Sequence, residues 1–590
     1  MNRSTLLLVG LAVVVFLVAG AAAIHKPPST DEAEFAAAGL GVAHTGRPIY
    51  YMGEVPERLI PESDRWLYNS GGQPHVQLGL WHASIYVFLI GLCYRLFGPE
   101  NWAARLTGAV CLGLDLWLLL RILRQLMAAE RYAWTASLMA ILFLANPFLL
   151  QEGLMLDIDN TVMTAALLFF LHEYLRMERP GLSWLGRVLR LAVLLSLISW
   201  AKELAGAYAL VAACGYEILA RRWRRVAALL IAAILGVALF AALWIALCRA
   251  LHVPADYFIA FSIKRRLAKA DGVFTQVVAR RGLTGAFVSI GKTLVHSATW
   301  VSPFWASLGL IALASRVRQM WRRRAPEPVD LLTIFVLFLL LLAKIVRPSG
   351  WFLKYEYPAY APLTLLIALW LAPRLSCPPW RRLVVAGILM IAVAWVQVVA
   401  LGDPVSTVYD LVVSPHATAS VLMLFYVVLG AALVGILFVL NRRRWQAPEP
   451  ILTAALIIGT LGAQLGLAWK QHAPYTTAPN WPNYAEPSFA PVVARLRNTL
   501  RPGDVPVCRK DIGYALRLGE PLPAGRWIDN AVVARLSTPR LPVEILAPEV
   551  THVVLDRYST RGDPARFLQP TFAVDFETDG YLVLRRERAP

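Results

Sequence analysis

The chain has 590 residues, of which 58% are hydrophobic and 16% are charged, and its formal net charge is +19. A soluble protein is typically about 45–50% apolar and about 25% charged, so this composition excludes an ordinary soluble enzyme and predicts a polytopic membrane protein. Much of the positive charge lies in short clusters between apolar runs, such as "ARRWRR" at 220–225, as is typical of cytoplasmic loops. The sequence has no basic stripe with interleaved aromatic residues, so we expect no nucleic-acid partner.

The six cysteines form no CxxC pair and predict neither a disulfide framework nor a zinc site.

The N-terminal segment, "MNRSTLLLVGLAVVVFLVAGAAAIHK", has a basic start, an apolar core and a small-residue end. This pattern is typical of a cleavable signal peptide, but it also fits a first membrane span that is retained. The many apolar segments that follow favour the retained span.

The membrane topology follows from the positions of the basic loops. The segments that approach the ~18 apolar residues of a spanning helix lie near 6–24, 78–97, 103–124, 132–150, 160–176, 186–201, 203–219, 226–248, 294–316, 329–346, 355–373, 382–401, 419–440 and 450–469. If all of them span, the basic loops fall on the wrong side of the membrane. The segment 78–97 is rich in interfacial residues, and we place it on the membrane surface. With this placement, the cytoplasmic side holds all of the basic loops, which lie at 121–131, 176–190, 220–225, 315–324, 374–382 and 441–445. About 13 spans result, with the N-terminus inside and the C-terminus outside.

Acidic residues follow the first span in the long outer loop, residues 25–102. The prolines of "HKPPSTDEAEF" end the span, and Ser29 or Thr30 is a candidate N-cap for a short helix that begins with Asp31 and Glu32. These carboxylates either stabilise the start of the helix or supply a general base at the membrane surface.

A second acidic stretch, "GLMLDIDNTV", places Asp157 and Asp159 outside, before a further apolar segment. One interpretation is a helix cap; the other is a carboxylate pair that holds a divalent cation or positions an acceptor hydroxyl. Basic residues lie at the same face of the membrane, and each could either reach the lipid headgroups or bind a phosphate. These basic residues are Arg105, Lys202, Arg347 and Lys354, and Lys344 also lies at this face. Asp115 lies inside a predicted span, and the sequence suggests no partner for it.

The C-terminal tail, residues 470–590, is more polar than the rest of the chain. Its strand-like runs "DVPVC", "THVVLD" and "GYLVLRRE" are separated by turn signals and predict a small α/β domain. It contains no recognisable catalytic motif. No convincing internal repeat is found, which disfavours a transporter built from two homologous halves.

The order of four stretches resembles a known family. "DEAEFAAAGL" follows the first span, and then come "QPHVQLGLWHASIYVFLIGLCYRLFGPENWAARL", "ANPFLLQEGLMLDIDNTVM" and "WAKE". This order resembles the GT-C superfamily of membrane glycosyltransferases, especially the protein O-mannosyltransferase and aminoarabinose transferase branch. The chain departs from the family at "QPHVQLGLWH", where a His/Lys-Pro-Pro-Leu element is usual and only His75 is a loose match.

The resemblance implies that a sugar on a polyprenyl phosphate is transferred, with inversion, to an acceptor hydroxyl outside the cytoplasm. Asp31 then looks like the base, with Glu32 beside it, and Asp159 or Asp157 would position the acceptor or a metal. The residues implied to bind the donor phosphate are Arg105, Lys202, Lys354, Arg347 and His75. A divalent cation, Mg²⁺ or Mn²⁺, is implied only in some branches; Asp31 and Asp159 would be its ligands.

We therefore expect a polytopic α-helical membrane protein of the GT-C type. Residues 1–469 would form the transmembrane glycosyltransferase domain, and 470–590 a soluble extracytoplasmic α/β domain. Such a protein would lie in the inner or plasma membrane, with membrane lipids around it and an envelope protein, lipid or polysaccharide as acceptor. Two alternatives remain open: a transporter or flippase of a lipid-linked sugar, to which Asp115 would point, and a membrane scaffold whose outer domain binds envelope polymers.

Overall fold

The structure, a computed structural model, describes residues 3–256, 282–284, 303–374, 489–530 and 547–587, apart from gaps inside these ranges. By their contacts, the parts of the chain form two units. We call Met1–Ala23 with Gly108–Ala473 the helical unit, and Ile24–Thr107 with Pro474–Pro590 the loop–tail unit. The first outer loop thus groups with the tail, although the two are far apart in sequence. The domain boundary at 469/470 remains a prediction.

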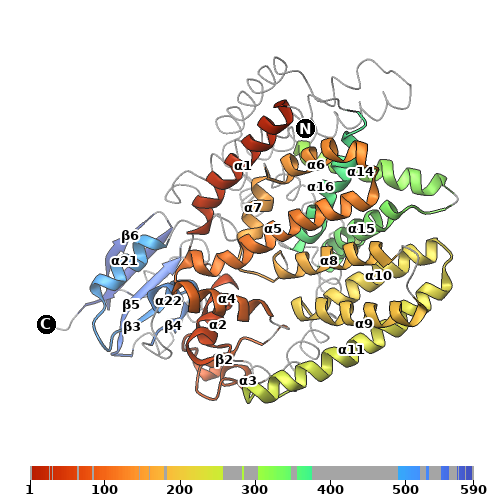
Figure 1. Cartoon of the computed structure of the whole chain (residues 1–590). Helices are drawn as coiled ribbons and strands as arrows, with labels where there is room; N and C mark the ends of the chain where they lie inside the picture. The colour runs from red at the N-terminus through yellow and green to blue at the C-terminus, as the bar shows by residue number, and fades with distance from the viewer. Residues whose placement is uncertain are drawn as a thin grey trace. The chain divides into compact units, whose positions relative to one another are not determined.

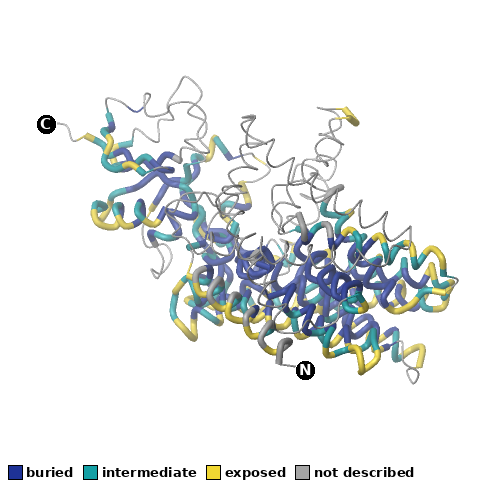
Figure 2. The backbone as a smooth tube through the Cα atoms, turned by 90° about the horizontal axis from the view of Figure 1, so that it is seen from above, coloured by how far each residue is buried: buried dark blue, intermediate teal, exposed yellow. Residues whose placement is uncertain are grey.

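Long apolar helices build the helical unit (Figure 1). Its described helices are α1 (Arg3–Ile24), α5 (Asn101–Leu126, which begins in the other unit), α6 (Ala129–Leu144), α7 (Pro147–Leu154), α8 (Val162–Met177), α9 (Trp184–Ala201), α10 (Ala205–Leu219), α11 (Trp223–Leu251), α14 (Pro303–Arg322), α15 (Pro328–Val346) and α16 (Tyr357–Leu371). Buried residues run through the interior of the helical unit (Figure 2). Helices α9 and α11 carry many exposed apolar residues, such as Leu189 and Val193 in α9 and Ile234 and Val237 in α11. Exposed apolar faces of this kind suit a lipid environment.

Three of the described helices are long and apolar enough to cross a membrane by themselves: α5, α9 and α11. A fourth span results if the bent pair α6 and α7 is taken as one. These helices identify a membrane protein, but the predicted total of about 13 spans is not confirmed. The predicted segments 382–401, 419–440 and 450–469 lie outside the described residues.

The predicted continuous span at 132–150 is broken in the structure. The helix α6 ends at Leu144, and α7 begins at Pro147 with a 67° change of direction. The side chain of Asn146 accepts hydrogen bonds from the backbone N–H groups of Phe148, at 3.0 Å, and Leu149, at 3.4 Å. Asn at the N-cap and Pro at the first helical position are strong signals for a new helix start, and here they outweigh the continuous apolar run.

Buried carboxylates hold two of the basic loops. The Glu217 carboxylate at the end of α10 accepts a hydrogen bond of 2.7 Å from the Tyr174 hydroxyl and lies 3.7 Å from Arg222 and 3.4 Å from Arg225. Glu173 in α8 pairs in the same way with Arg176, at 2.9 Å, and with Arg190. A buried charge is costly unless it is paired. These ion pairs therefore hold the basic loops against Glu173 of α8 and Glu217 of α10.

In the loop–tail unit, two helices of the first outer loop pack closely together. They are α2 (Asp31–Thr45) and α4 (Ile85–Phe97). A side chain added at Gly39 would collide with Ile90, and one added at Gly91 would collide with Val42. The other elements of this loop are β1 (Ile49–Tyr51), which pairs antiparallel with β2 (Val76–Leu78), the short turn η1 (Glu57–Leu59) and α3 (Arg65–Tyr68). With 13 residues, α4 is shorter than the ~20 residues of a spanning helix, and its position on the membrane surface remains a prediction.

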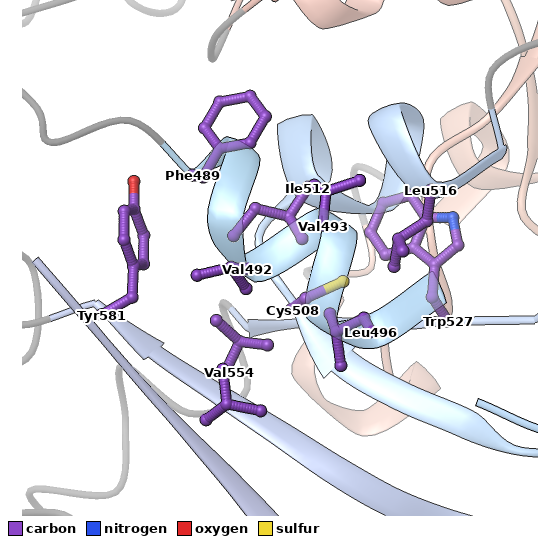
Figure 3. Packing of buried hydrophobic residues seen from close by; sticks show 11 residues of the cluster. Phe489, Val492, Val493, Leu496, Cys508, Ile512, Leu516, Trp527, Val554 and Tyr581 are labelled. Carbon is purple, nitrogen blue, oxygen red and sulfur yellow. The ribbon is translucent and has the colours of Figure 1, made fainter. Parts of the chain in front are cut away.

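The tail folds into a five-stranded sheet with the order β4-β3-β5-β7-β6. The strand β3 (Val505–Cys508) is parallel to β4 (Ile528–Asp529) and β5 (Val550–Asp556). The strands β5, β7 (Tyr581–Arg586) and β6 (Phe572–Glu577) are antiparallel neighbours. Two helices, α21 (Ala490–Thr499) and α22 (Lys510–Arg517), share an apolar core with the sheet (Figure 3). The predicted α/β fold is confirmed, and each of the three predicted strands is present.

The first outer loop extends this sheet at its β4 edge. The backbone N–H of Glu54 donates to the Trp527 carbonyl at 2.9 Å, and the N–H of Asp529 donates to the Glu54 carbonyl at 3.2 Å. The Trp527 ring lies against Gly53 and Gly513, where any side chain would collide with it. The hydroxyls of Tyr94 and Tyr514 are 2.8 Å apart. Backbone pairing, packing and hydrogen bonds thus join the loop and the tail.

Candidate functional site

The first turn of α2 carries three carboxylates, Asp31, Glu32 and Glu34. Negative charge at a helix N-terminus is favourable because the free N–H groups there carry partial positive charge. Residues three apart lie on the same side of a helix, so Asp31 and Glu34 share one face while Glu32 points elsewhere. The turn therefore presents carboxylates in two directions.

Glu32 is held by Arg105, which lies near the start of α5. The two guanidinium nitrogens Nη1 and Nη2 donate to the two carboxylate oxygens at 2.6 and 3.2 Å. Nη2 also donates to the Pro27 carbonyl at 3.3 Å. The side chains of Arg105 and Glu32 are only 3% and 2% exposed, so this is a buried, two-pronged ion pair. The structure thus brings together two residues that the sequence predicted for the site, and each contacts the other.

On the other face of the turn, a lysine of the tail contacts both remaining carboxylates. The Lys510 ammonium, at the first residue of α22, lies 2.5 Å from Glu34 and 3.7 Å from Asp31. Burial by itself lowers the pKa of Lys510, but Glu34 and Asp31 outweigh burial and raise it above its ordinary value. No sequence pattern marks this contact, because Lys510 and Glu34 are 476 residues apart.

Exposure distinguishes the three carboxylates. The side chain of Asp31 is 44% exposed, that of Glu34 is 22% exposed and that of Glu32 is 2% exposed. A group that abstracts a proton from an acceptor must be reachable by it. Asp31 is the carboxylate of this turn that best meets that requirement.

His75 lies elsewhere in the loop–tail unit, just before β2. Its backbone has a φ of 63°, and its N–H donates a hydrogen bond to the side-chain oxygen of Asn69 at 3.3 Å. The ring makes an edge contact with Tyr51, with 6.3 Å between the ring centroids. Burial lowers the pKa of His75, although Glu54 opposes this effect. The contact between His75 and the donor phosphate stays a prediction.

The helical unit holds the other described candidates. Asp157 is buried in the loop after α7, and its backbone carbonyl accepts a short hydrogen bond from the Thr161 hydroxyl. In the same loop, the Asn160 amide donates to the backbone carbonyl of Glu152. Glu152 is itself a buried carboxylate that the sequence analysis did not single out. Asp159 lies outside the described residues, so the choice between Asp157 and Asp159 stays open.

Lys202 is buried at the C-cap of α9, with its ammonium 5.7 Å from the centre of the Tyr355 ring. This is a cation–π distance. The next two residues after Tyr355 are polar and buried: Glu356 accepts a short hydrogen bond from Tyr360, and Tyr357 donates to Asp115 at 3.2 Å. The structure therefore gives Asp115 a partner that the sequence did not reveal. Arg347 and Lys354 lie outside the described residues.

A metal site was predicted from Asp31 and Asp159. Among the described residues, no group of three His, Cys, Asp or Glu side chains is placed to hold a metal ion. Asp31 has the Lys510 ammonium at 3.7 Å, and positive charge beside a ligand opposes cation binding. Because Asp159 is not among the described residues, the metal remains a prediction.

The structure is similar to that of ArnT from Cupriavidus metallidurans bound to undecaprenyl phosphate, with a TM-score of 0.57 and 15% sequence identity over 98% of this chain and 97% of that chain. The apo state of the same protein gives a TM-score of 0.54 and 16% identity, with the same coverage. The Archaeoglobus fulgidus oligosaccharyltransferase in its apo form gives a TM-score of 0.45 and 11% identity, over 92% of this chain and 69% of that chain. No protein-family model matches the sequence, and no curated protein matches it. The likeness to ArnT shows that this chain has the GT-C fold, which confirms the resemblance stated from the sequence.

Proposed function

We propose that this GT-C-fold membrane protein is a glycosyltransferase that moves a sugar from a polyprenyl phosphate to an acceptor hydroxyl on the extracytoplasmic face. The observation that carries the proposal is the first turn of α2, where two cations hold the neighbouring carboxylates and Asp31 stays 44% exposed. The lipid-phosphate donor is supported by the ArnT structure, which is bound to undecaprenyl phosphate.

In the proposed reaction, Asp31 accepts the proton of the acceptor hydroxyl as its oxygen attacks the anomeric carbon of the sugar. The bond between that carbon and the phosphate oxygen breaks, and the polyprenyl phosphate leaves with the electron pair. Attack opposite the leaving group inverts the anomeric configuration. General-base catalysis of this kind contributes about 10²–10⁴-fold to a rate.

The other predicted residues take supporting roles in this proposal. Asp157 or Asp159 positions the acceptor, and Lys202 contacts the donor phosphate as a compact positive charge. Arg105, His75, Arg347 and Lys354 are further proposed phosphate contacts. Because Arg105 is buried against Glu32, it is also proposed to fix the turn that carries Asp31.

The proposal is tested by giving the purified protein, in proteoliposomes, radiolabelled sugars on polyprenyl phosphate or on nucleotides, together with crude envelope acceptor. We expect label to move from a lipid donor to the acceptor and free polyprenyl phosphate to accumulate. Consumption of a nucleotide sugar instead would contradict the proposed donor. Lipid-linked sugar that crosses the bilayer unconsumed would contradict the enzyme and indicate the transporter alternative.

The transporter alternative has less support in the structure. Asp115 was the one residue that pointed to it, because a carboxylate within a span usually marks a substrate path. Asp115 accepts a hydrogen bond from Tyr357, and both side chains are fully buried. This hydrogen bond links α5 to α16 and gives Asp115 a partner, and we do not propose transport.

A further inference from the structure

We propose that Lys510, contributed by the tail, is a positioning residue for Asp31 in the proposed transfer reaction. Its ammonium would hold the first turn of α2 in place and keep the Asp31 carboxylate oriented toward the acceptor. This inference rests on the proposed function and gives the tail a part in it.

The contact is built from two helices that pack together. Lys510 begins α22, and Asp31 begins α2. The ammonium lies 2.5 Å from Glu34 and 3.7 Å from Asp31, the two carboxylates that share one face of the turn. The Lys510 side chain is 25% exposed, so its charge is partly shielded from water and acts more strongly on its neighbours than a surface charge does.

The α22 helix that carries Lys510 is itself firmly held. Arg509, the preceding residue, pairs with Asp511 at 2.6 and 2.8 Å. One turn further along, Gly513 lies against Trp527, and the Tyr514 hydroxyl is 2.8 Å from that of Tyr94. A positioning residue needs such support, because a displacement of about 1 Å near the reacting atoms can cost about 10²-fold in rate.

The charges around the turn explain why a cation is needed there. Asp31 and Glu34 are like charges three residues apart, which destabilises a helix unless it is compensated. Lys510 faces both of them and also Asp529 of β4, while Glu32 and Arg105 neutralise each other nearby. Lys510 therefore offsets the repulsion between Asp31 and Glu34 and holds the turn in position.

The test compares transfer by the full-length protein with that of Lys510→Met, Lys510→Arg, Asp31→Asn and the double variant Lys510→Met with Asp31→Asn. We expect Lys510→Met to lower kcat at least about tenfold with little change in the donor KM, because the base, and not the donor, is displaced. Lys510→Arg should recover most of the rate, since it keeps the charge. In single-turnover assays, Lys510→Met should cause little further loss in the Asp31→Asn background, because groups that act as a unit are not additive.

Arg526→Met is the matched control, because it breaks another contact between the first outer loop and the tail. Arg526 pairs with Glu54 at 2.5 and 2.8 Å. We expect the kcat of Arg526→Met to stay within about twofold of the wild-type value. This comparison separates the positioning of Asp31 from a general weakening of the loop–tail unit.

Each of the following results would overturn the inference. If Lys510→Met transfers sugar at the wild-type rate while Asp31→Asn does not, Lys510 has no positioning role, and the proposed function stands. The role also fails if Lys510→Arg is as impaired as Lys510→Met, or if the losses of Lys510→Met and Asp31→Asn multiply. If the wild type transfers no sugar from any donor, the proposed function falls and this inference falls with it.

Discussion

Asp31 and Glu32 are adjacent in sequence, but the helix turns their side chains to different partners. Successive residues of an α-helix point about 100° apart. Glu32 turns to Arg105 and is buried, while Asp31 turns to Lys510 and stays partly exposed. The acidic pair that the sequence presents as one motif thus divides into a carboxylate that holds the turn and one that an acceptor can reach.

The buried pair of Glu32 and Arg105 gives a prediction at the scale of one contact. We expect Glu32→Gln to destabilise the protein by about 3–5 kcal/mol, because it leaves the Arg105 charge buried without its partner. Arg105→Lys keeps the charge but loses the fork that reaches both carboxylate oxygens, and it should also lower the midpoint of thermal unfolding in detergent. Arg65→Lys is the control, since Arg65 and Glu57 form an exposed pair 3.8 Å apart. Unchanged thermal unfolding in Glu32→Gln would show that the pair does not hold the turn.

At the scale of elements, α5 and α7 approach each other at two glycines. A side chain added at Gly108 would collide with the backbone carbonyl of Gly153, and one added at Gly153 would collide with Leu112. Backbone cannot move aside as a flexible side chain can, so the contact requires glycine at position 108, whereas the obstacle at Gly153 is the side chain of Leu112.

We expect Gly108→Ala to destabilise the protein by about 1–3 kcal/mol, the usual cost of overpacking a core. Gly113→Ala is the matched control in the same helix, because a Cβ there meets no described atom within 4 Å. It should be neutral or slightly stabilising, since alanine favours a helix over glycine by up to about 1 kcal/mol. Thermal unfolding of both variants in detergent checks the prediction; equal midpoints would refute it.

The sequence predicted most described elements because their apolar runs are long and periodic. The segments at 103–124, 186–201 and 226–248 correspond to α5, α9 and α11. The break between α6 and α7 was missed, although Asn146 and Pro147 are the local signal for it. Strand β6, "FAVDFE", was also missed, because its charged residues interrupt the apolar pattern of an edge strand.

The candidate site was less predictable than the fold. The sequence could place Asp31, Glu32 and Arg105 at the same side of the membrane, but not show that Arg105 binds Glu32. Lys510 could not be found at all, because no local pattern marks a contact between residues 476 positions apart. Tertiary packing of the tail on the first outer loop creates that contact, and such packing leaves no periodic trace in one sequence.

At the scale of the whole molecule, the first outer loop and the tail form a single unit. One of the ion pairs that joins them is sensitive to acid. Burial works to raise the pKa of Glu54, but Arg526 outweighs it and lowers this pKa below its ordinary value. A carboxyl group with a lowered pKa stabilises the folded state above its unfolded pKa of about 4.3, and this stabilisation is lost as the pH falls through the folded pKa.

We therefore expect Arg526→Met to lower the stability of the loop–tail unit at pH 7, and the difference from wild type to shrink below about pH 4. Limited proteolysis and thermal unfolding at the two pH values measure this difference. Arg497→Met is the control, because Arg497 donates to the Ala515 carbonyl, at 2.6 Å, which does not titrate over this range. A difference between Arg526→Met and wild type that is the same at both pH values would contradict the prediction.

In the proposed reaction, Asp31 is the base of a sugar transfer from a polyprenyl phosphate. The most direct measurement compares wild type and Asp31→Asn in the transfer of radiolabelled sugar, with binding of the lipid donor measured in parallel. Glu57→Gln, which alters an exposed carboxylate of the same loop, is the control. We predict that Asp31→Asn binds the donor normally but loses about 10²–10⁴-fold in kcat, while Glu57→Gln keeps its activity. Transfer at the wild-type rate by Asp31→Asn would contradict this role of Asp31.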